Sequence, residues 1–197
     1  MKVSRAQAEE NRRTVVDAAG RLFREHGFDG VGLSELMRAA GLTHGGFYKQ
    51  FKSKQDLAVE ASDSLLAASA ERWRRVSTEA GLDAFPTLVR RYLSAIHRDR
   101  RADGCAFAAL GPDVTRQDAG LRRSFETGLA AHLAVLDETM HGAPQPAPSN
   151  AALAALSTMV GALLLSRMVE DDTLSRRILD AATGALLDAP APPAAKT

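Results

Sequence analysis

Apolar residues recur every three or four positions along most of the chain, which is the spacing of one face of an α-helix. In the first such segment, from about Arg5 to His26, they form one stripe that consists of Val15, Val16, Ala19, Leu22 and Phe23. Few segments alternate with a period of two, and clusters of β-branched and aromatic residues are missing, so strands are not expected. The pattern predicts an all-α protein.

Two short helices joined by a turn at Gly41 are predicted next. The first begins near Gly32, and the second runs from Thr43 to Phe51. Within the second, Phe47 and Phe51 are four residues apart and are expected to share the buried face. Two helices joined by a glycine turn form a helix-turn-helix, whose second helix can enter the major groove of DNA.

The rest of the chain continues the helical pattern. Ser53 and Asp56 form a capping box, so the next helix is expected to begin there and to run to about Glu79. Further helices are predicted at 83–98, 117–140, 150–169 and 173–188, together with a short apolar segment at 105–110 that Gly111-Pro112 is expected to break. Composition predicts a linker at 142–150 and a disordered tail at 189–197.

Composition narrows the class of protein. The chain has 197 residues, of which 45% are hydrophobic, enough to bury a core. Its single cysteine excludes an intramolecular disulfide, and no Cys/His cluster has the spacing of a zinc site, so neither metal nor cofactor is expected. The N-terminal residues lack the apolar core of a secretory signal, and the longest apolar run, 159–165, is too short to span a membrane. A soluble, cytoplasmic protein is expected.

Charge is divided unevenly along the chain. Residues 1–56 contain 10 Lys and Arg against 7 Asp and Glu, whereas residues 57–197 contain 15 against 17. The N-terminal part is therefore positive and the remainder slightly negative. This asymmetry favours an anionic partner at the N-terminal end.

The short segment after the glycine turn carries groups suited to nucleic acid. Thr43, His44, Tyr48 and Lys49 offer a hydroxyl, an imidazole, a phenol and a cation, all of which can bind phosphate oxygens or base edges. They are predicted to lie on a face opposite the phenylalanines. This grouping makes the segment the candidate DNA-reading element.

Three neighbouring residues have two readings each. Gly45 and Gly46 each cost a helix about 1 kcal/mol relative to Ala. They either let a partner approach the backbone closely or let two helices pack tightly. Lys54 lies at the first turn of the next helix, where it is either a phosphate clamp or an ordinary solvated lysine. Lys52 and Arg12 or Arg13 are weaker phosphate candidates.

The segments AAGRLFREHGF and LMRAAGLTHGGFYKQFKSKQDL resemble the DNA-binding domain of the TetR family of bacterial transcriptional regulators. The resemblance covers about residues 9–69, with the helix-turn-helix at about 32–51. By position, it implies DNA contacts from Thr43, Gly45, Tyr48, Lys49 and Lys54. The chain departs from the family pattern at Gly32, where the family commonly has a capping Thr or Ser that can touch phosphate.

The resemblance also implies the role of the remaining chain. Residues 70–188 are expected to form a variable helical domain that binds a small-molecule effector and forms a homodimer through its last two long helices. The implied function is a repressor that releases a palindromic operator when the effector binds. A weaker similarity to one subgroup of these repressors lies in GCAFAALG, at 104–111.

Candidate effector-binding residues can be named within that domain. They are Tyr92, Ile96, Cys105, Phe107, Phe125, Leu129, His132 and Met159, although residues of these types at helical spacing more often belong to the core. Cys105 is either a small buried hydrophobe or a sensor of electrophiles, and the latter would make thiol modification the switch. The alternative from another class is a helical small-molecule-binding protein or enzyme. No nucleophile, base and orienting group have a recognisable catalytic spacing, so no catalytic residue is assigned.

Overall fold

The chain folds into helices connected by turns and short loops. A computed structural model describes residues 4–188, and in that range it contains helices and no strand. The all-α prediction is therefore confirmed, while the predicted disordered tail at 189–197 lies outside the described residues.

The N-terminal helices follow the predicted boundaries closely. Helix α1 spans Arg5–His26, and its N-terminus is capped by the Ser4 hydroxyl, which accepts a hydrogen bond from the backbone N–H of Gln7. Helix α2 spans Leu33–Ala39, and helix α3 spans Lys54–Ala80. Between α2 and α3 lies the short helix η1, His44–Lys49.

Helix η1 differs in type from the predicted α-helix at 43–51. It is a 3₁₀-helix in which the N–H of Gly46 donates to the carbonyl of Thr43 and the N–H of Gln50 to that of Phe47. Two consecutive glycines weaken α-helical preference here. About two tight turns are therefore enough to present its side chains.

The predicted helix at 83–98 is divided in two. After the short helix η2, Gly81–Asp83, helix α4 spans Ala84–Tyr92 and helix α5 spans Ala95–Asp99. Ser94 causes the break, because its extended backbone and its hydroxyl, which accepts from the N–H of His97, begin a new helix.

The predicted break at Gly111-Pro112 is wrong. Helix α6 spans Ala106–Val114 and contains Pro112. Proline removes one backbone donor, but only two helical residues follow it, so little of the helix is disturbed. Leu110 and Val114, on either side, are both buried, and their packing favours the continuous helix.

The last three helices are long. Helix α7 spans Ala119–His141, α8 spans Asn150–Met168 and α9 spans Asp172–Leu187. Their N-termini are capped by the side chains of Asp118, Ser149 and Asp171, each accepting from a backbone N–H. The side-chain cap at Ser149 agrees with the predicted start of the long Ala/Leu helix.

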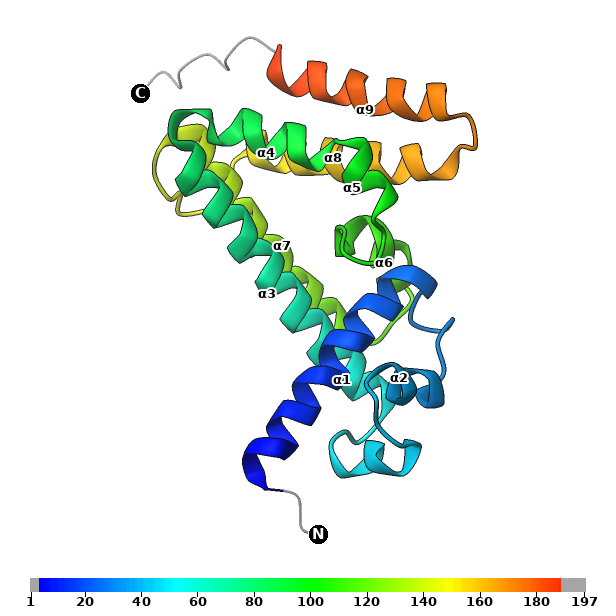
Figure 1. Cartoon of the computed structure of the whole chain (residues 1–197). Helices are drawn as coiled ribbons and strands as arrows, with labels where there is room; N and C mark the ends of the chain where they lie inside the picture. Colours follow the sequence, from blue (N-terminus) through cyan, green and yellow to red (C-terminus); the bar gives the residue numbers. More distant parts are fainter. Residues whose placement is uncertain (1–3, 189–197) are drawn as a thin grey trace.

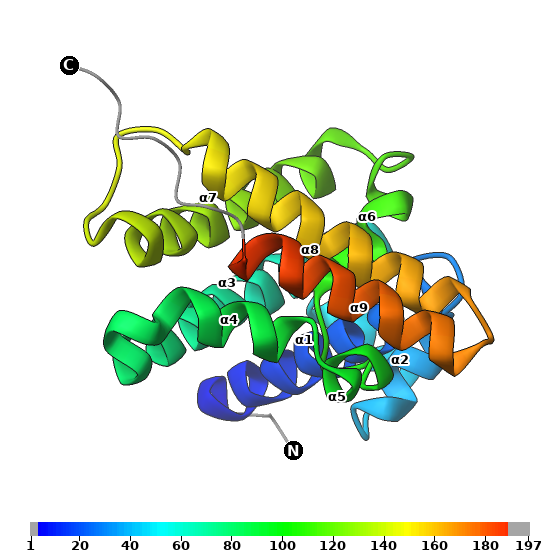
Figure 2. The ribbon, with the colours of Figure 1, turned by 90° about the horizontal axis from the view of Figure 1, so that it is seen from above.

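Two long helices connect the ends of the molecule (Figure 1). Helices α1, α2 and η1 lie at one end, while α4, α8 and α9 lie at the other, and α3 and α7 run side by side between them. A Cβ at Gly128 of α7 would lie 2.8 Å from the Leu66 side chain of α3, so the two helices approach closely at this glycine. Helices α8 and α9 pack beside each other as an outer layer (Figure 2).

The core of the N-terminal helices extends into later parts of the chain. The cluster around Phe23, Leu36 and Phe47 also contains Leu110 of α6 and Leu121 of α7. The hydrophobic core therefore runs across the predicted domain boundary near residue 69, and the division of roles at that boundary stays a prediction.

Helix α8 is unusually apolar. It is the one helix between residues 4 and 188 that is long and apolar enough to cross a membrane, a test that core helices of globular proteins also pass. The structure packs it against α7 and α9. Only 39% of its most apolar window is buried in the chain itself.

Candidate nucleic-acid interface and ligand cavity

A tight turn sets the angle between α2 and η1. Gly41 has φ of 69°, a left-handed conformation that favours glycine. The N–H of Leu42 then donates to the carbonyl of Met37, over 2.9 Å, and this bond closes the turn. The sequence Gly41-Leu42 thus produces the predicted turn between two helices.

Two aromatic residues fix η1 to the core. The side chains of Phe47 and Phe51 are 0% and 2% exposed, and their ring centroids are 5.5 Å apart. Phe47 also contacts the ring of Tyr48 edge-on, at 5.2 Å between centroids. The buried face expected from the four-residue spacing is confirmed.

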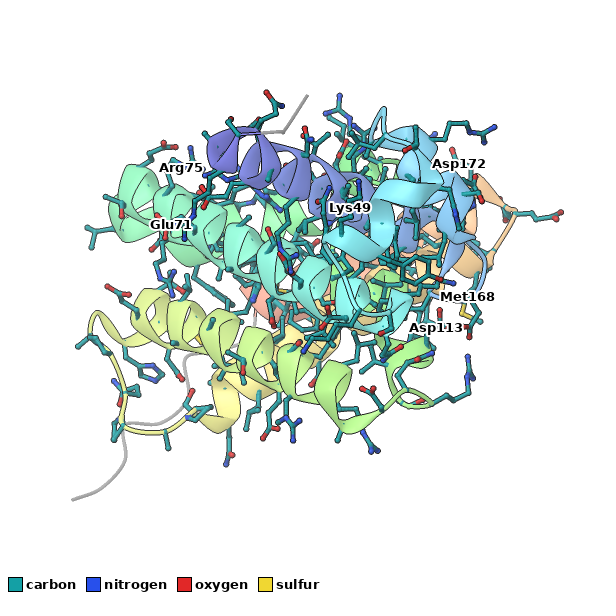
Figure 3. The ribbon with its side chains drawn as sticks, turned by 90° about the horizontal axis from the view of Figure 1, so that it is seen from below. Lys49, Glu71, Arg75, Asp113, Met168 and Asp172 are labelled. Carbon is teal, nitrogen blue, oxygen red and sulfur yellow. The ribbon has the colours of Figure 1, made fainter. Side chains whose placement is uncertain are left out.

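The opposite side of η1 faces solvent. Tyr48 is 65% exposed, and its ring lies edge-on to that of His44, with 6.3 Å between centroids. Thr43 and Lys49 are also exposed, and Figure 3 shows Lys49 on η1 at the end of the molecule that faces the viewer. The structure therefore brings the four predicted polar residues to one outer surface.

The two glycines of η1 are not required by internal packing. A Cβ added at Gly45 would meet no atom within 4 Å, and one at Gly46 would have ordinary contacts of 3.7 Å and longer. Neither residue has a positive φ. Tight helix packing therefore does not account for the pair, and the close approach of an external partner stays a prediction.

Lys54 is the first residue of α3 and is half-buried beside the helix cap. The Ser53 hydroxyl accepts from the N–H of Asp56, and the Asp56 carboxylate accepts from the N–H of Lys52. The predicted cap is thus present, with its carboxylate bonded one residue earlier than in a standard capping box. Lys54 lies near the free N–H groups of the first helical turn, which favour anions.

Arg12 has a structural role that the sequence did not indicate. Its guanidinium pairs with Glu60 of α3, donates to the backbone carbonyl of Gln50 and lies 4.3 Å above the ring of Phe51. These contacts join α1 to the end of η1. Arg12 is therefore occupied in positioning η1, whereas Arg13 lies exposed near Glu10.

A cavity of about 610 Å³ lies beside α3, α4 and α5. Four of the predicted effector-binding residues line it: Tyr92, Ile96, Cys105 and His132. They come from four different elements that meet where the chain breaks between α4 and α5. The cavity thus depends on the Ser94 break.

The other four predicted lining residues lie elsewhere. Phe125 and Met159 are buried in separate core clusters, and Leu129 is 40% exposed on α7. Phe107 is one step behind the cavity wall, because its ring packs against that of His132, at 5.2 Å between centroids. Helical spacing could not separate cavity lining from core for these residues.

Further residues of the cavity were not predicted. They include Trp73, which was expected only to pack α3 against the C-terminal domain, and His97, which is on the second half of the broken helix. Four arginines also line the cavity: Arg72, Arg90, Arg91 and Arg100. Clustering of basic residues at 72–75 and 90–100 was the available signal, but such runs usually mark a solvated face.

Cys105 is buried in the wall of the cavity. Burial raises its pKa above the usual value, so the protonated thiol is favoured over the thiolate. In the part of the chain from residue 4 to residue 188, no group of three or more His, Cys, Asp or Glu residues is placed to hold a metal ion.

A hydrogen bond connects the wall of the cavity to α1. The side chain of Arg24, on α1, donates to the carbonyl of Ala102, in the loop after α5. The same loop contributes Arg100, Asp103 and Gly104 to the cavity. Displacement of this loop would therefore disturb its hydrogen bond with Arg24 and could move α1 with it.

Comparison with known proteins agrees with this geometry. Residues 15–61 match the family model for bacterial regulatory proteins of the tetR family. The chain is 40% identical over 57 residues to the HTH-type transcriptional regulator AcrR of Shigella flexneri, a match that covers 29% of this chain and 26% of AcrR. It is 25% identical over 134 residues to the HTH-type transcriptional repressor NemR of Escherichia coli strain K12, covering 66% and 67% of the two chains.

Solved structures share the whole fold. The reduced form of E. coli NemR superposes with a TM-score of 0.79 at 20% identity, covering 93% of this chain and 99% of NemR. A TetR transcriptional regulator from Chloroflexus aurantiacus has a TM-score of 0.75 at 24% identity, with 92% and 96% covered. FadR from Bacillus subtilis, solved with stearoyl-CoA, has a TM-score of 0.66 at 17% identity, with 89% and 97% covered.

Proposed function

The chain belongs to the TetR family of bacterial regulatory proteins, and we propose that it is a ligand-responsive transcriptional regulator of operator DNA. The observation that carries the proposal is the division of the molecule. An exposed polar face lies on η1 at one end, and an open cavity lies further along α3, the helix that begins beside η1. The relatives it resembles are regulators rather than enzymes.

Helix η1 would enter the major groove. In this proposal the DNA contacts come from Thr43, His44, Gly45, Gly46, Tyr48, Lys49 and Lys54. The exposed phenol, imidazole and hydroxyl supply hydrogen bonds, and the glycines allow the backbone to approach the DNA. Lys49 and Lys54 supply phosphate contacts, so affinity should fall as salt rises.

The apolar outer layer supports a homodimer through α8 and α9. Large apolar side chains are exposed there: Leu153, Leu165, Met168 and Leu174. Met168 alone is 69% exposed, and only 39% of the apolar window of α8 is buried within one chain. A second copy would remove this surface from water and place two η1 segments against a palindromic operator, at half-sites about 34–36 Å apart.

Ligand binding would act through the cavity. A molecule that moves the loop after α5 would act on α1 through the Arg24 contact and change the spacing of the paired η1 segments. The name of NemR as a repressor and the stearoyl-CoA bound in FadR support this direction, in which an effector releases a repressor in the cytoplasm. The mechanism does not need modification of Cys105, whose thiol is buried.

DNA binding can be tested with the purified full chain. Genomic DNA that co-purifies with the protein would be sequenced, and the enriched palindrome would be used in gel-shift titrations over a range of salt concentrations. Tyr48→Ala should weaken binding roughly tenfold or more, since it removes a groove contact. Leu82→Ala, which trims another exposed side chain at the far end of α3, should bind like the wild type. No preference over random DNA, or equal binding by Tyr48→Ala, would refute the proposal.

A further inference from the structure

The cavity beside α3 has an aromatic wall. The ring of Trp73 meets that of Tyr92 at 5.8 Å and that of His132 at 4.9 Å between centroids, in edge-on geometry at both contacts. The ring of His97 continues the wall, 4.7 Å from Tyr92. Val76 and Leu88 add apolar surface to the same cavity. A wall of this kind suits an apolar, ring-containing ligand.

Both ring nitrogens of each histidine in the wall form hydrogen bonds with other groups of the protein. His97 donates from Nδ1 to the carbonyl of Tyr92, at 2.6 Å, and accepts at Nε2 from the N–H of Cys105, at 3.0 Å. His132 donates from Nδ1 to the carbonyl of Gly128 and accepts at Nε2 from the Ser69 hydroxyl. Each ring has one donating and one accepting nitrogen, which is the pattern of a neutral imidazole. Neither ring has a nitrogen left for a ligand.

One buried polar group in the wall is unpartnered. The Tyr92 hydroxyl has no hydrogen-bond partner among residues 4–188, although the side chain is only 5% exposed. Its polar neighbour is the Cys105 thiol, a weak hydrogen-bonding group, and burial raises the pKa of the Tyr92 phenol well above its usual value. The hydroxyl is therefore a neutral donor, buried in the wall of the cavity, and a ligand acceptor would reach it only after a neighbouring side chain shifts.

Positive charge dominates the lining. The cavity has four arginines, and Asp103 is its single carboxylate. None of the four arginines is in an ion pair with another residue of the described chain. Arg72 is close enough to both cavity histidines to help lower the pKa of each, after the larger effect of burial. Arg72 is an exposed residue of α3 that lines the same cavity as the aromatic wall.

We propose that this cavity is built for an organic carboxylate whose apolar ring lies against Trp73 and Tyr92 and whose charged end pairs with Arg72. The planar guanidinium offers two parallel N–H donors, which match the two oxygens of a carboxylate. Arg100, from the loop after α5, is placed on the same lining to add a second cation. This inference rests on the proposed function only in making the carboxylate the regulatory ligand.

The position of Arg72 gives the proposal a link to the N-terminal helices. Arg72 and Asp103 also line a neighbouring hollow of about 450 Å³, whose other side includes Arg21 and Arg24 of α1. A carboxylate bound at Arg72 would thus lie next to the loop that Arg24 holds. The ligand would therefore bind beside the loop after α5, which contacts α1.

The proposal can be tested without DNA. Trp73 is the only tryptophan of the chain, so its fluorescence reports directly on the cavity wall. The full-length protein would be titrated with 3-phenylpropionate, with the neutral 3-phenylpropanamide of the same shape, and with propionate, which lacks the ring. We expect 3-phenylpropionate to alter Trp73 fluorescence and to bind about tenfold or more tightly than either comparison compound.

Two variants on α3 distinguish a direct contact with the carboxylate from a general effect of positive charge. Arg72→Gln should remove the preference for the carboxylate over the amide, whereas Arg75→Gln, which removes the same charge outside the cavity, should keep it. Tyr92→Phe should lower 3-phenylpropionate affinity without lowering thermal stability, a combination that a merely structural hydroxyl would not give. Circular dichroism melts would confirm that the variants fold.

Several outcomes would overturn the proposal. They are equal binding of the acid and the amide, absence of any change in Trp73 fluorescence, and equal loss of binding in Arg72→Gln and Arg75→Gln. A separate gel-shift titration then distinguishes the two proposals. If the acid binds as expected but leaves the protein on its operator, ligand-responsive regulation fails while the carboxylate site stands.

Discussion

The chain has two tyrosines, and each marks a region with opposite physical demands. Tyr48 on η1 is 65% exposed, whereas Tyr92 in the cavity is 5% exposed. The polar groups around Tyr48 face water, which satisfies them until a partner arrives. Around Tyr92 the protein itself must satisfy polar groups, and it does so for both histidines but not for the phenol. A surface site can therefore offer many weak contacts, whereas a partly buried site selects with the few groups left unpaired.

The two regions also differ in what holds them in place. Helix η1 is short and is fixed from beneath by Phe47 and Phe51, with Arg12 at its end. The cavity lies beside α3 and α7 where α4 ends and α5 begins, and it is braced by hydrogen bonds between side chain and backbone. Burial of apolar side chains should therefore determine the stability of the region around η1. Hydrogen bonding of buried polar groups should determine the stability of the cavity.

The largest expected effect is on the anchor of η1. Phe47→Ala should lower the free energy of unfolding by about 3–5 kcal/mol, because it empties a fully buried site. Tyr48→Ala, one residue later, should change it by only about 0.5 kcal/mol. Urea unfolding of both variants would measure the difference. Similar losses would show that η1 is not divided into an anchoring face and a free face.

A smaller effect is expected at the brace of η1. Arg12→Ala should cost about 1 kcal/mol of stability and should weaken operator binding roughly tenfold by loosening η1. The slope of affinity against salt should stay unchanged, while Lys49→Ala should reduce that slope by about one. Arg13→Ala is the matched control. A reduced slope in Arg12→Ala would mean that this arginine touches phosphate.

Removal of the unpartnered Tyr92 hydroxyl is expected to increase the stability of the protein. Tyr92→Phe should raise the free energy of unfolding of the ligand-free protein by up to about 1 kcal/mol, since it removes a buried hydroxyl without a partner. Tyr48→Phe should leave stability unchanged and weaken only DNA binding. Thermal melts of the two variants would sharpen the contrast between the regions. A loss of stability in Tyr92→Phe would reveal a partner for the hydroxyl.

The smallest expected effect is that of pH on the cavity. Burial is the main cause of the lowered pKa of both His97 and His132, so the unfolded chain binds protons at a higher pH than the folded chain. The free energy of unfolding should therefore keep its full value above a pH of about 6.5, the pKa of histidine in the unfolded chain. It should decline as the pH falls below that value. Melts between about pH 7.5 and 5 would follow this decline, and His132→Gln should flatten it. A slope that His132→Gln leaves unchanged would assign the decline to other groups.

Local rules explain why the N-terminal region could be predicted from the sequence. Gly41 specifies its own turn, Ser53 and Asp56 specify a cap, and the spacing of Phe47 and Phe51 specifies a buried face. Each signal acts within a few residues, so no knowledge of distant contacts is needed. Only the 3₁₀ form of η1 departs from the expectation.

The cavity was predicted only in part, because it is formed by contacts between distant residues. Ser94 reads as an ordinary helical residue until its hydroxyl caps a second helix. Arg72 and Arg100 read as solvated surface, and only the fold brings them to the same cavity as Trp73. At Pro112, the burial of neighbouring side chains overrode the local preference of proline.

Helix α3 connects the region around η1 to the cavity. It carries Lys54 at its start and Arg72 about 27 Å further along, on one continuous helix. If a bound carboxylate weakens operator binding through this helix and α1, thermodynamic linkage requires the operator to weaken carboxylate binding by the same factor. Protein held on DNA would then sense its ligand less sensitively than protein free in solution. The concentration at which the regulator responds would thus depend on the number of operators available, as well as on the chemistry of the cavity.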